Sequence, residues 1–537
     1  MEQTLLGTLT NLVPLVLIFL IFKTFSTRRT NVRLPPGPPG LPIIGNIHQL
    51  SIDAWTTFTA WKDVYGIHSS PFQRNESRLT IACEGPIIYL NLAGQNVIVL
   101  NTAEAANQLL DDRAAIYSDR PNWIVACQML TEGLFMPFVR YGDTWRRMRR
   151  AAHQGLHQNA VEKYKPIQAK EALILINDLL MDPDDWVKHV RRAGGSTVLG
   201  VAYNIPTIKS IDHPQLNAIF DFTIHLVNTA YVDSFLVESF PWLRHFPAWM
   251  MTWKARALRW SRESIPMFRS MYEKVKQDWE NGLAQPNLTT VVVEQQEKFG
   301  LNDTEITWMV AAIAAASETM TGVLAWLFLA MAMYPEVQAR AQAELDRVVG
   351  RDRLPSFDDI DDLPYIRAMV KEVLRLNPVD PLGLQHRSIE DDVYKGYFIP
   401  KGTVCIANVW AMNRDIDVYG PDAHIFKPER HLDIEGNLKP ALPGTKNEGH
   451  HTFGFGRRIC VGRYLANNSL YIDIASILWF FTIHPPVHSD GTAVKLTEET
   501  VNEGLVVRPL HYNYSFKPRL AEGPKFLEDS LEEVTGC

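Results

Sequence analysis

The segment His451–Gly462, HTFGFGRRICVG, carries the residue types best suited to chemistry. Its one cysteine, Cys460, follows a glycine-rich loop and opens an apolar helical pattern. A helix N-terminus offers unpaired N–H groups and the positive end of the helix dipole, and both stabilise a thiolate. Gly454 and Gly456 permit a tight turn, and Gly462 allows a flat ligand to approach the helix closely.

A buried structural cysteine is the alternative interpretation, because that is the commonest fate of a lone cysteine. Arg458 stands two residues before Cys460 and can pair with an anionic group beside the sulfur. The chemistry of the loop alone leaves both interpretations open. The chain has five cysteines, which are odd in number and far apart. This spacing argues against a disulfide framework or a four-cysteine zinc site, and it fits a reducing compartment.

The loop resembles the haem-binding signature F-x-x-G-x-R-x-C-x-G of the cytochrome P-450 superfamily. It matches that signature at every fixed position, namely Phe453, Gly456, Arg458, Cys460 and Gly462. The resemblance covers roughly residues 34–515. It implies haem b (iron protoporphyrin IX) as cofactor, with the Cys460 thiolate as the axial ligand of the haem iron. A thiolate ligand favours O–O bond cleavage.

Further landmarks follow in the order that the family has. Glu372 and Arg375 in KEVLR resemble its E-x-x-R pair, and at i, i+3 they share one helix face. Arg430 in FKPERH resembles the arginine that completes this structural network, although the family usually has Phe or Trp where His431 stands. Two further sites follow from the resemblance. Trp145 and Arg149 resemble a W-x-x-x-R pair over one haem face, and His386 occupies the place of a haem-propionate ligand.

Glu318 and Thr319, in AASET, resemble the acid–alcohol pair that the family uses catalytically on its long helix. A hydroxyl there can donate to bound oxygen, and the acid can relay protons through water. Without the haem motif, a polar pair bonded to the helix backbone would be the better interpretation. The pattern departs from the family twice, because Ala316 replaces the usual glycine and Met320 replaces a common Thr or Ser.

The pattern predicts mostly helices with short strand pairs, and the resemblance implies the mainly α P-450 fold with small β-sheets. One long helix is predicted from about Thr304 to Tyr334, capped by Asn302 or Asp303. Its polar centre at Ser317–Thr321 favours a buried core helix over a second membrane span. Strands are predicted as a pair at Pro86–Leu100 and as a hairpin at Asp391–Asn408 that turns at Pro400-Lys401-Gly402.

The N-terminus predicts a membrane anchor. Leu5–Phe22 has no charged residue, and basic residues follow it, which keeps the rest of the chain cytoplasmic. A cleaved signal peptide and a tail lying on the membrane are the alternatives. We therefore divide the chain into an anchor with a basic stop-transfer segment (1–33), a Pro-rich hinge (34–46) and a catalytic domain (47–537) with a tail at 516–537. Microsomal members imply a single-pass protein of the endoplasmic reticulum, facing the cytosol.

Residues 67–85 have no counterpart in the usual family pattern, in which Tyr-Gly runs directly into Pro and the first strand. They are polar and poorly patterned. Because 19 residues correspond to 57 nucleotides, in frame, this segment is either a loop insertion or a translated intron. Deleting it is predicted to preserve haem binding.

The charge balance of 53 basic against 60 acidic residues gives a net charge of −7 and no sign of a nucleic-acid partner. A local basic cluster is the exception, and it is either a solvated helix face or a docking patch for an acidic electron donor (Arg146, Arg147, Arg149 and Arg150). The chain has no suitable G-x-G-x-x-G dinucleotide motif. The resemblance implies electrons from an NADPH–cytochrome reductase carrying FAD and FMN.

Apolar and aromatic residues crowd two segments that align with the substrate-covering loop and the roof helices of the family, Asn122–Phe138 and Phe220–Trp253. They indicate a lipophilic small-molecule substrate, with core packing or membrane contact as the alternative. The sequence thus predicts a monooxygenase that uses O2, resembling fungal members that act on terpenoids or other secondary metabolites. The rival functions are a reductase-independent isomerase or dehydratase of hydroperoxides and a non-catalytic haem or lipid carrier.

Overall fold

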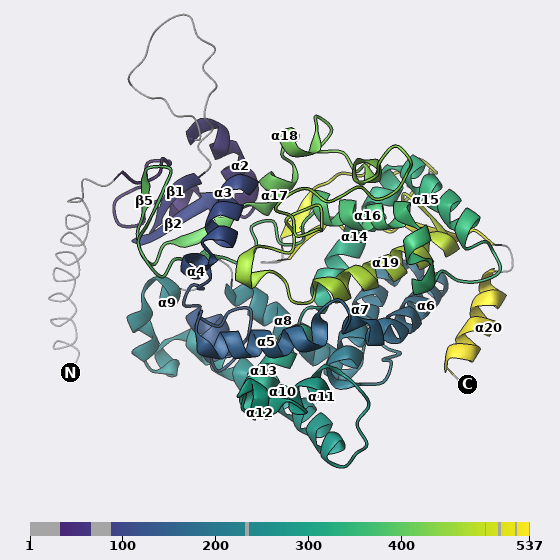
Figure 1. Cartoon of the computed structure of the whole chain (residues 1–537), viewed down its shortest axis with the longest axis horizontal. Helices are drawn as coiled ribbons and strands as arrows, with labels where there is room; N and C mark the ends of the chain where they lie inside the picture. The colour runs from purple at the N-terminus through teal and green to yellow at the C-terminus, as the bar shows by residue number, and fades with distance from the viewer. Residues whose placement is uncertain are drawn as a thin grey trace, which may run out of the picture. The chain divides into compact units, whose positions relative to one another are not determined.

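The computed structural model describes residues 33–65, 87–230, 236–488, 490–502, 506–520 and 523–535. These residues form two compact units (Figure 1). The first holds the described residues up to Asp119 together with Gln385–Asn408, and the second holds Arg120–Leu384 and the described residues from Val409 onward. The predicted anchor at Leu5–Phe22 and the extra segment at 67–85 lie outside the described residues.

The first unit is built on a four-stranded sheet of order β1-β2-β6-β3. The predicted strand pair is confirmed, because β1 and β2 are antiparallel and register Ile87 with Leu100. Alternating apolar residues form this pair, and its inner side chains are fully buried. The unit contains β1 (Ile87–Leu92), β2 (Gln95–Leu100), β3 (His386–Arg387), β6 (Val404–Ala407), α2 (Ala54–Tyr65), α3 (Ala103–Ala106) and α4 (Ala114–Tyr117).

The predicted hairpin at Asp391–Asn408 is wrong in its pairing. The hairpin joins β4 (Asp392–Tyr394) to β5 (Tyr397–Ile399). Its turn is Lys395-Gly396, whose φ angles of 47° and 82° suit a two-residue turn that matches strand twist. Strand β6 instead pairs in parallel with β2, because its four buried residues need neighbours inside a sheet.

The Pro-rich segment is bound to β1 and is not a free linker along its whole length. The amide of Tyr89 donates to the carbonyl of Pro36 at 2.8 Å. Asn46 and Asn91 exchange two hydrogen bonds, of 2.7 and 2.8 Å. Because proline lacks an amide donor, its carbonyls provide the polar groups that fix this segment.

The second unit is a helical body whose described residues include two two-stranded sheets, β7-β10 and β8-β9, and Figure 1 labels most of its helices. Helix α7 packs against α6 and α14, and α19 packs against α6 and α16. Its longer helices are α5 (Asp143–Leu156), α6 (Lys165–Met181), α7 (Trp186–Tyr203), α8 (Pro214–Ala230), α10 (Thr252–Glu280), α13 (Asp303–Ala314), α14 (Ser317–Met333), α15 (Pro335–Val348), α16 (Pro364–Leu376), α19 (Arg463–Phe480) and α20 (Gly523–Thr535).

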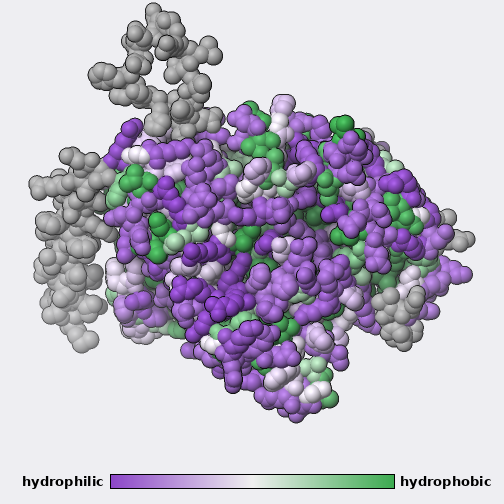
Figure 2. Space-filling model, in the orientation of Figure 1, coloured by the Kyte–Doolittle hydropathy of each residue, from purple (hydrophilic) through white to green (hydrophobic). Residues whose placement is uncertain are grey.

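Short elements connect these helices. They are η3 (Ile124–Met129), α9 (Leu236–Ser239), η6 (Pro241–His245), η7 (Ala248–Met250), α11 (Leu288–Val293), α12 (Gln296–Phe299), α17 (Val409–Asn413), α18 (Ile416–Tyr419), η9 (Pro428–His431), η10 (Gly456–Arg458), β7 (Phe481–His484), β8 (Thr500–Asn502), β9 (Val507–Pro509) and β10 (Ser515–Pro518). The face seen in Figure 2 is mostly hydrophilic.

Among the described residues, one helical segment is long and apolar enough to cross a membrane, Asp303–Met333. Most of this segment is buried inside the protein. Asn302 caps it through a reciprocal capping box with Glu305. The expected single helix is divided at Ala315–Ala316 into α13 and α14. The prediction of a core helix therefore holds, but the prediction of an unbroken helix is wrong.

The segment predicted as a tail contains a packed helix. Leu527 of α20 is buried, and the ring of Phe526 lies 5.6 Å from that of Trp479 on α19. Gly523 lies against the ring of Phe480. These contacts make α20 part of the apolar core around the end of α19.

Candidate active site

The glycine-rich loop folds so that Cys460 stands just before α19. Gly454 and Gly456 have φ angles of 79° and 54°, which side chains disfavour, and they reverse the chain. The amide of Cys460 donates back to the carbonyl of Phe453 at 2.9 Å. Gly462 is the N-cap residue of α19, and its amide donates to the Cys460 sulfur.

The Cys460 side chain is exposed, although it sits among packed elements. Desolvation raises the pKa of its thiol, whereas the Gly462 amide and the charges of Arg149 and Arg463 lower it. The donors around it favour a negatively charged sulfur once a positive partner is present.

Two arginines connect this loop to neighbouring elements, Arg149 of α5 and Arg458 of the loop itself. The Arg149 guanidinium donates to the carbonyl of Ile459, and burial lowers its pKa to about 10. Arg458 donates to the carbonyl of Val139 at 2.7 Å, and its guanidinium lies 4.2 Å from the Trp145 ring centroid. Trp145 is buried. The loop, α5 and the Val139 turn therefore form one rigid frame.

The division between α13 and α14 has a local cause. The Thr319 hydroxyl donates to the carbonyl of Ala316 at 2.8 Å, and the amide of Thr319 approaches the same carbonyl. A hydroxyl that bonds the backbone in this way competes with the helical ladder. Ala316 and Thr319 are exposed, whereas Ser317 and Glu318 between them are buried.

Glu318 is held by two arginines that the sequence interpretation missed. Arg191 of α7 contacts Oε1 at 2.8 Å, and Arg508 of β9 contacts Oε2. The Glu318 side chain is only 6% exposed, so these are buried ion pairs. No local motif marks two single arginines on distant elements, so the sequence gives no signal for them.

Cys460, Ala316 and Thr319 each keep exposed surface, although buried residues adjoin each of them in the sequence. Ala312 and Ala315 of the α13 end share a hydrophobic core with Val461 and Leu465 of the α19 start. Accessible surface inside a buried helix requires a space that protein atoms do not fill. An accessible thiol at the start of α19 is the residue type that ligates a haem iron, and an accessible hydroxyl on α14 is one that can donate a proton.

Comparison with known proteins agrees with this geometry. The family model for cytochrome P450 matches residues 35–516.

The chain belongs to the cytochrome P450 family.

Its relatives include P450 monooxygenases of fungi. One from Armillaria gallica is 45% identical, over 93% of this chain and 92% of its own length. One from Postia placenta is 43% identical, over 91% and 89%. The P450 monooxygenase iboC of Amanita muscaria is 35% identical, over 93% of both chains. This chain is accordingly a P450 monooxygenase, and membership implies a haem-iron cofactor, a redox partner and O2.

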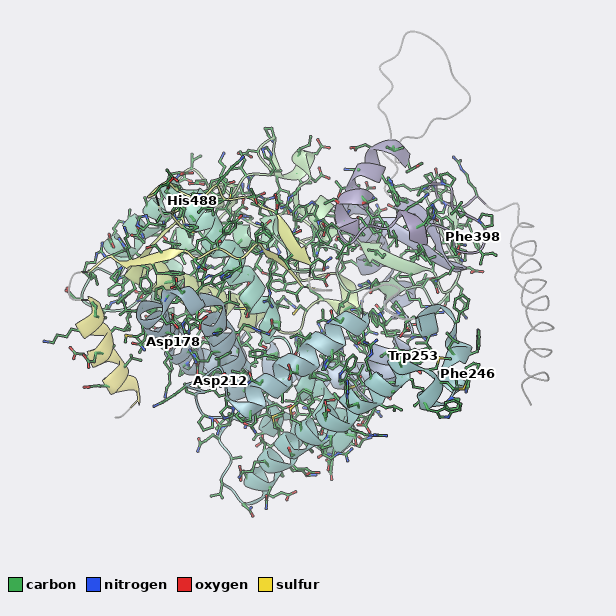
Figure 3. All side chains as sticks on the ribbon, turned by 180° about the vertical axis from the view of Figure 1, so that it is seen from behind. Asp178, Asp212, Phe246, Trp253, Phe398 and His488 are labelled. Atoms are coloured by element: carbon green, nitrogen blue, oxygen red, sulfur yellow. The ribbon has the colours of Figure 1, made fainter. Side chains whose placement is uncertain are left out.

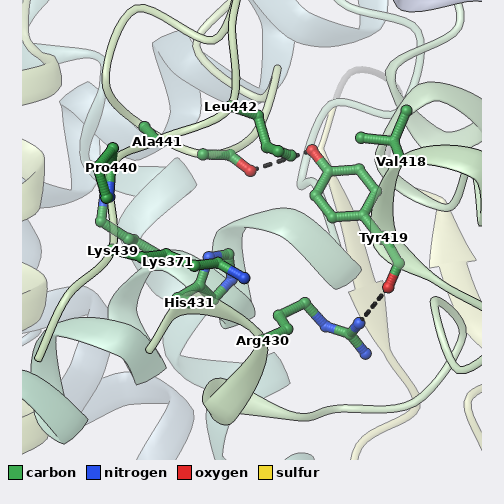
Figure 4. A pocket seen from close by; sticks show the side chains of 10 residues that line it. Lys371, Val418, Tyr419, Arg430, His431, Lys439, Pro440, Ala441 and Leu442 are labelled. Carbon is green, nitrogen blue, oxygen red and sulfur yellow. Dashed lines mark hydrogen bonds between the residues drawn. The ribbon is translucent and has the colours of Figure 1, made fainter. Parts of the chain in front are cut away.

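A buried ion network lies beside the P450 loop. Glu372 accepts hydrogen bonds from Arg375 at 2.8 Å through both carboxylate oxygens and from Arg430 at 3.0 Å. His431 adds a contact of 2.9 Å from Nε2 to Glu372. Figure 4 shows Arg430 and His431 lining a small pocket with Tyr419, whose carbonyl accepts from Arg430. Where many family members have an aromatic ring, this P450 has a fourth polar member of the network.

His386 belongs to the first unit, whereas the residues described above belong to the second. It is buried on β3, and its Nδ1 contacts the carbonyl of Tyr117 at 2.8 Å. Beside it the backbone amide of Arg387 donates to the backbone carbonyl of Asp119 at 2.9 Å. The Nδ1 hydrogen bond fixes the orientation of the imidazole.

Acid is expected to destabilise this P450 through its buried histidines. Burial lowers the pKa of His451 to about 4, that of His450 well below 6.5, and that of His431 in the same direction. Below pH 6.5 these histidines become protonated in the unfolded chain, whereas they stay neutral in the folded protein. The free energy of unfolding is therefore expected to fall by roughly 1 kcal/mol per such histidine on going to pH 5.5.

Denaturant unfolding at pH 7.5 and pH 5.5 checks this expectation. His189 is the control, because its side chain is only half-buried and its imidazole contacts the Asp182 carbonyl at 2.8 Å. His451→Asn should reduce the difference between the two pH values, and His189→Asn should not. Equal midpoints at both pH values in the parent protein would contradict the interpretation.

Proposed function

We propose that this P450 is a membrane-anchored haem-thiolate monooxygenase that oxidises a lipophilic secondary metabolite, such as a terpenoid. The observation that carries the proposal is the accessible thiol of Cys460 at the start of α19, which the Gly462 amide and the charge of Arg149 surround. Haem b bound through Cys460 would supply reductive activation of O2, which thiolate ligation favours.

The residues around the thiol have separate tasks in this proposal. Gly462 and Arg149 stabilise the charge on the sulfur, and Gly456 and Phe453 hold the loop that presents it. Trp145 and Arg458 would contact the haem, and the family resemblance assigns a haem propionate to His386. The ion network of Glu372, Arg375 and Arg430 would support the position of the loop.

Glu318 and Thr319 would deliver the protons that the reaction consumes. The Thr319 hydroxyl now donates to Ala316, so it must rotate before it can donate to a bound oxygen species. Arg191 and Arg508 hold Glu318 through one oxygen each, so a change in the position of its carboxylate requires these side chains to move with it. Proton delivery is thus coupled to side-chain motion at the break between α13 and α14.

Thr319→Ala is expected to keep haem and substrate binding while it diverts reduced oxygen to hydrogen peroxide. Losing a general acid typically costs 10²–10⁴-fold in the step that it serves, so product formed per NADPH should fall at least severalfold. Thr321→Ala, two residues on and buried, is a matched control. NADPH, product and peroxide are measured together, and unchanged coupling would remove Thr319 from the mechanism.

Electrons would arrive from an NADPH–cytochrome reductase with FAD and FMN. The arginines of helix α5 support a docking site for such a reductase, because two of them contact the protein and two are exposed. Arg149 is directed to the loop and Arg147 pairs with Glu305 at 2.8 Å, whereas Arg146 and Arg150 are exposed. Figure 2 shows hydrophilic side chains over this helix. Exposed positive charge near the thiolate suits an acidic flavoprotein, and rapid reduction should weaken with salt.

An aromatic chain supports an apolar substrate. The ring of Trp123 lies 4.6 Å from that of Phe138, and Phe135 connects Phe138 to Phe222 of α8. Phe222 in turn lies 6.0 Å from Trp308 of α13. Aromatic and apolar linings with few polar groups select large lipophilic molecules.

Membrane attachment would combine the predicted anchor with a surface near α10. Trp242, Trp249 and Met250 are highly exposed there. Phe246 and Trp253, labelled in Figure 3, belong to the same stretch. The ammonium group of Lys254 donates a hydrogen bond to the carbonyl of Phe246 at 2.9 Å. Exposed tryptophans beside cations suit a membrane interface. The domain boundaries at 33 and 46, and the endoplasmic reticulum as location, complete the proposal.

Reconstitution tests the proposed function. The purified full chain is combined with an NADPH–cytochrome reductase and a panel of terpenoids, and NADPH consumption and oxidised product are measured. We expect product that requires NADPH, reductase and O2 together. Turnover of hydroperoxides without NADPH would instead support an isomerase or dehydratase, and haem binding without turnover of any kind would support a carrier.

A further inference from the structure

A small pocket lies beside the Glu372 network, lined by residues of α16, α18, η9 and the segment 439–449 (Figure 4). Its volume is about 70 Å³, whereas sites for drug-sized molecules usually have about 300–1,000 Å³. Lys439 in its lining is exposed and His431 is buried, so the pocket extends from the surface toward the network. These dimensions suit a small ion.

The lining of this pocket is basic. Of its ten residues four have basic side chains, and none has a carboxylate. Arg430 donates to the carboxylates of Glu372 and Asp422 and to backbone carbonyls, so its charge is already compensated. The other basic groups remain for a ligand. A basic lining without an acid favours an anion.

Two lysines keep donors for such an anion. The ammonium group of Lys371 donates to the carbonyls of Asn447 and Glu448 at 3.0 and 2.9 Å. An ammonium group has three protons, and the residues that the structure describes provide no third acceptor. The ammonium group of Lys439 makes no hydrogen bond or ion pair within the described part of the chain. The backbone amide of Lys439 donates to the carbonyl of His431 at 3.1 Å, which fixes this lysine beside the buried histidine.

His431 offers an acceptor to the pocket. Its Nε2 contacts Glu372 at 2.9 Å. Burial raises the pKa of Glu372, but hydrogen bonds from Arg375 and His431 lower it to about 2, so this carboxylate is ionised and can only accept. Nε2 therefore carries a proton. Because burial lowers the pKa of His431, the ring stays neutral and Nδ1 keeps its lone pair.

The position of Nδ1 makes it available to a ligand. It has no hydrogen-bond partner among the described residues. A Cβ at Gly449, which also lines the pocket, would lie 3.5 Å from this nitrogen. In the view of Figure 4 the side chains of Lys371, Lys439 and His431 lie on one side of the pocket. The pocket thus combines two cationic donors with one neutral acceptor.

We propose that this pocket binds inorganic phosphate and that His431 selects phosphate against sulfate. The unprotonated oxygens of hydrogen phosphate accept from Lys371 and Lys439, and its remaining O–H donates to Nδ1 of His431. Sulfate has a similar shape and charge but no proton at neutral pH, so it directs an oxygen at the lone pair of Nδ1. Bound phosphate connects α16 to η9 and the segment 439–449, and it stabilises the folded protein in proportion to its occupancy.

Isothermal titration calorimetry of the full-length protein tests the site without depending on catalysis. In phosphate-free buffer at pH 7.5 and constant ionic strength, we expect saturable binding of phosphate and at least tenfold weaker binding of sulfate. Lys439→Ala should weaken phosphate binding about tenfold, because it removes one charge-assisted hydrogen bond. Lys495→Ala removes an exposed lysine of the same unit and is the matched control. Absence of saturable binding, equal affinity for sulfate, or equal losses in both variants would overturn the proposal.

His431→Phe tests the selection between the two anions. Phenylalanine is a residue that the family usually has here, and it keeps a ring but no acceptor. The affinity for phosphate should therefore fall to that for sulfate, and a preference for phosphate that survives would overturn the role of His431. This variant also loses the contact with Glu372, so its fold is checked by circular dichroism. If it does not fold, the comparison of the two anions in the parent protein decides.

Hydrogen exchange locates the bound ion. The amide of Lys439, which donates to His431, should exchange severalfold more slowly in saturating phosphate, because the ion holds both residues in place. The amide of Leu283, which donates to Asp278 elsewhere in the same unit, is the control and should not change. Unchanged exchange at Lys439 with phosphate bound would place the ion elsewhere and overturn this site.

Discussion

Replacing Cys460 with serine is expected to abolish the strongly red-shifted Soret band of the reduced carbon monoxide complex. A serine hydroxyl has a far higher pKa than a thiol, so the Gly462 amide and the Arg149 charge would no longer suffice to hold a charged ligand. Product formation should fall below detection, because thiolate donation favours O–O cleavage. The spectrum of the parent protein and the variant, recorded with equal haem, is the measurement.

Cys127→Ser is the matched control for this change. Cys127 is a free cysteine too, but unlike Cys460 it is buried, its surroundings are apolar core, and burial raises its pKa to about 12. A thiol of that kind is uncharged and structural. The control should therefore keep the red-shifted band. A red-shifted band that survives in Cys460→Ser would require a different ligand and would withdraw the proposed role of Cys460.

Glu372→Ala is expected to be the most destabilising single substitution in the ion network. It leaves Arg375, which is fully buried, without its charged partner. Removing one member of a buried ion pair costs about 3–5 kcal/mol, a large part of the stability of a typical domain. We expect poor haem retention and a much lower denaturant midpoint, measured by haem absorbance and circular dichroism on the same samples.

Asp361→Ala provides the comparison for an exposed ion pair of the same helix. Asp361 pairs with Arg367 of α16 at 3.1 Å, but its side chain is 89% exposed. Such pairs contribute about 0–1 kcal/mol, so this variant should behave like the parent. Similar losses in Asp361→Ala and Glu372→Ala would show that the network has no special importance.

Local patterns predicted the elements that carry the site. The i, i+3 spacing of Glu372 and Arg375 places both on one face of α16, and the structure adds Arg430 to them. The glycine-rich loop and the start of α19 follow from residue types alone, because glycine and helix capping act over a few residues. The strand pair at residues 87–100 follows for the same reason.

Non-local pairing is where the sequence failed. Strand β6 pairs with β2, which lies more than 300 positions away in the sequence. The residues next to β6 in the sequence therefore do not indicate which strand it pairs with. The break at Ala315–Ala316 occurs among strong helix formers and depends on one hydroxyl of Thr319. Arg191 and Arg508 meet Glu318 only after α7, α14 and β9 have packed together.

The shared carboxylate of Glu318 makes these three positions epistatic. A library that varies residue 508 alone leaves Glu318 half paired, and most of its members would lose stability whatever they gain in activity. Joint replacement of Glu318 and Arg508 by apolar residues of similar volume removes the unpaired charge and should be tolerated better than either change alone. Directed evolution of this enzyme should therefore treat Arg191, Glu318 and Arg508 as one unit of variation.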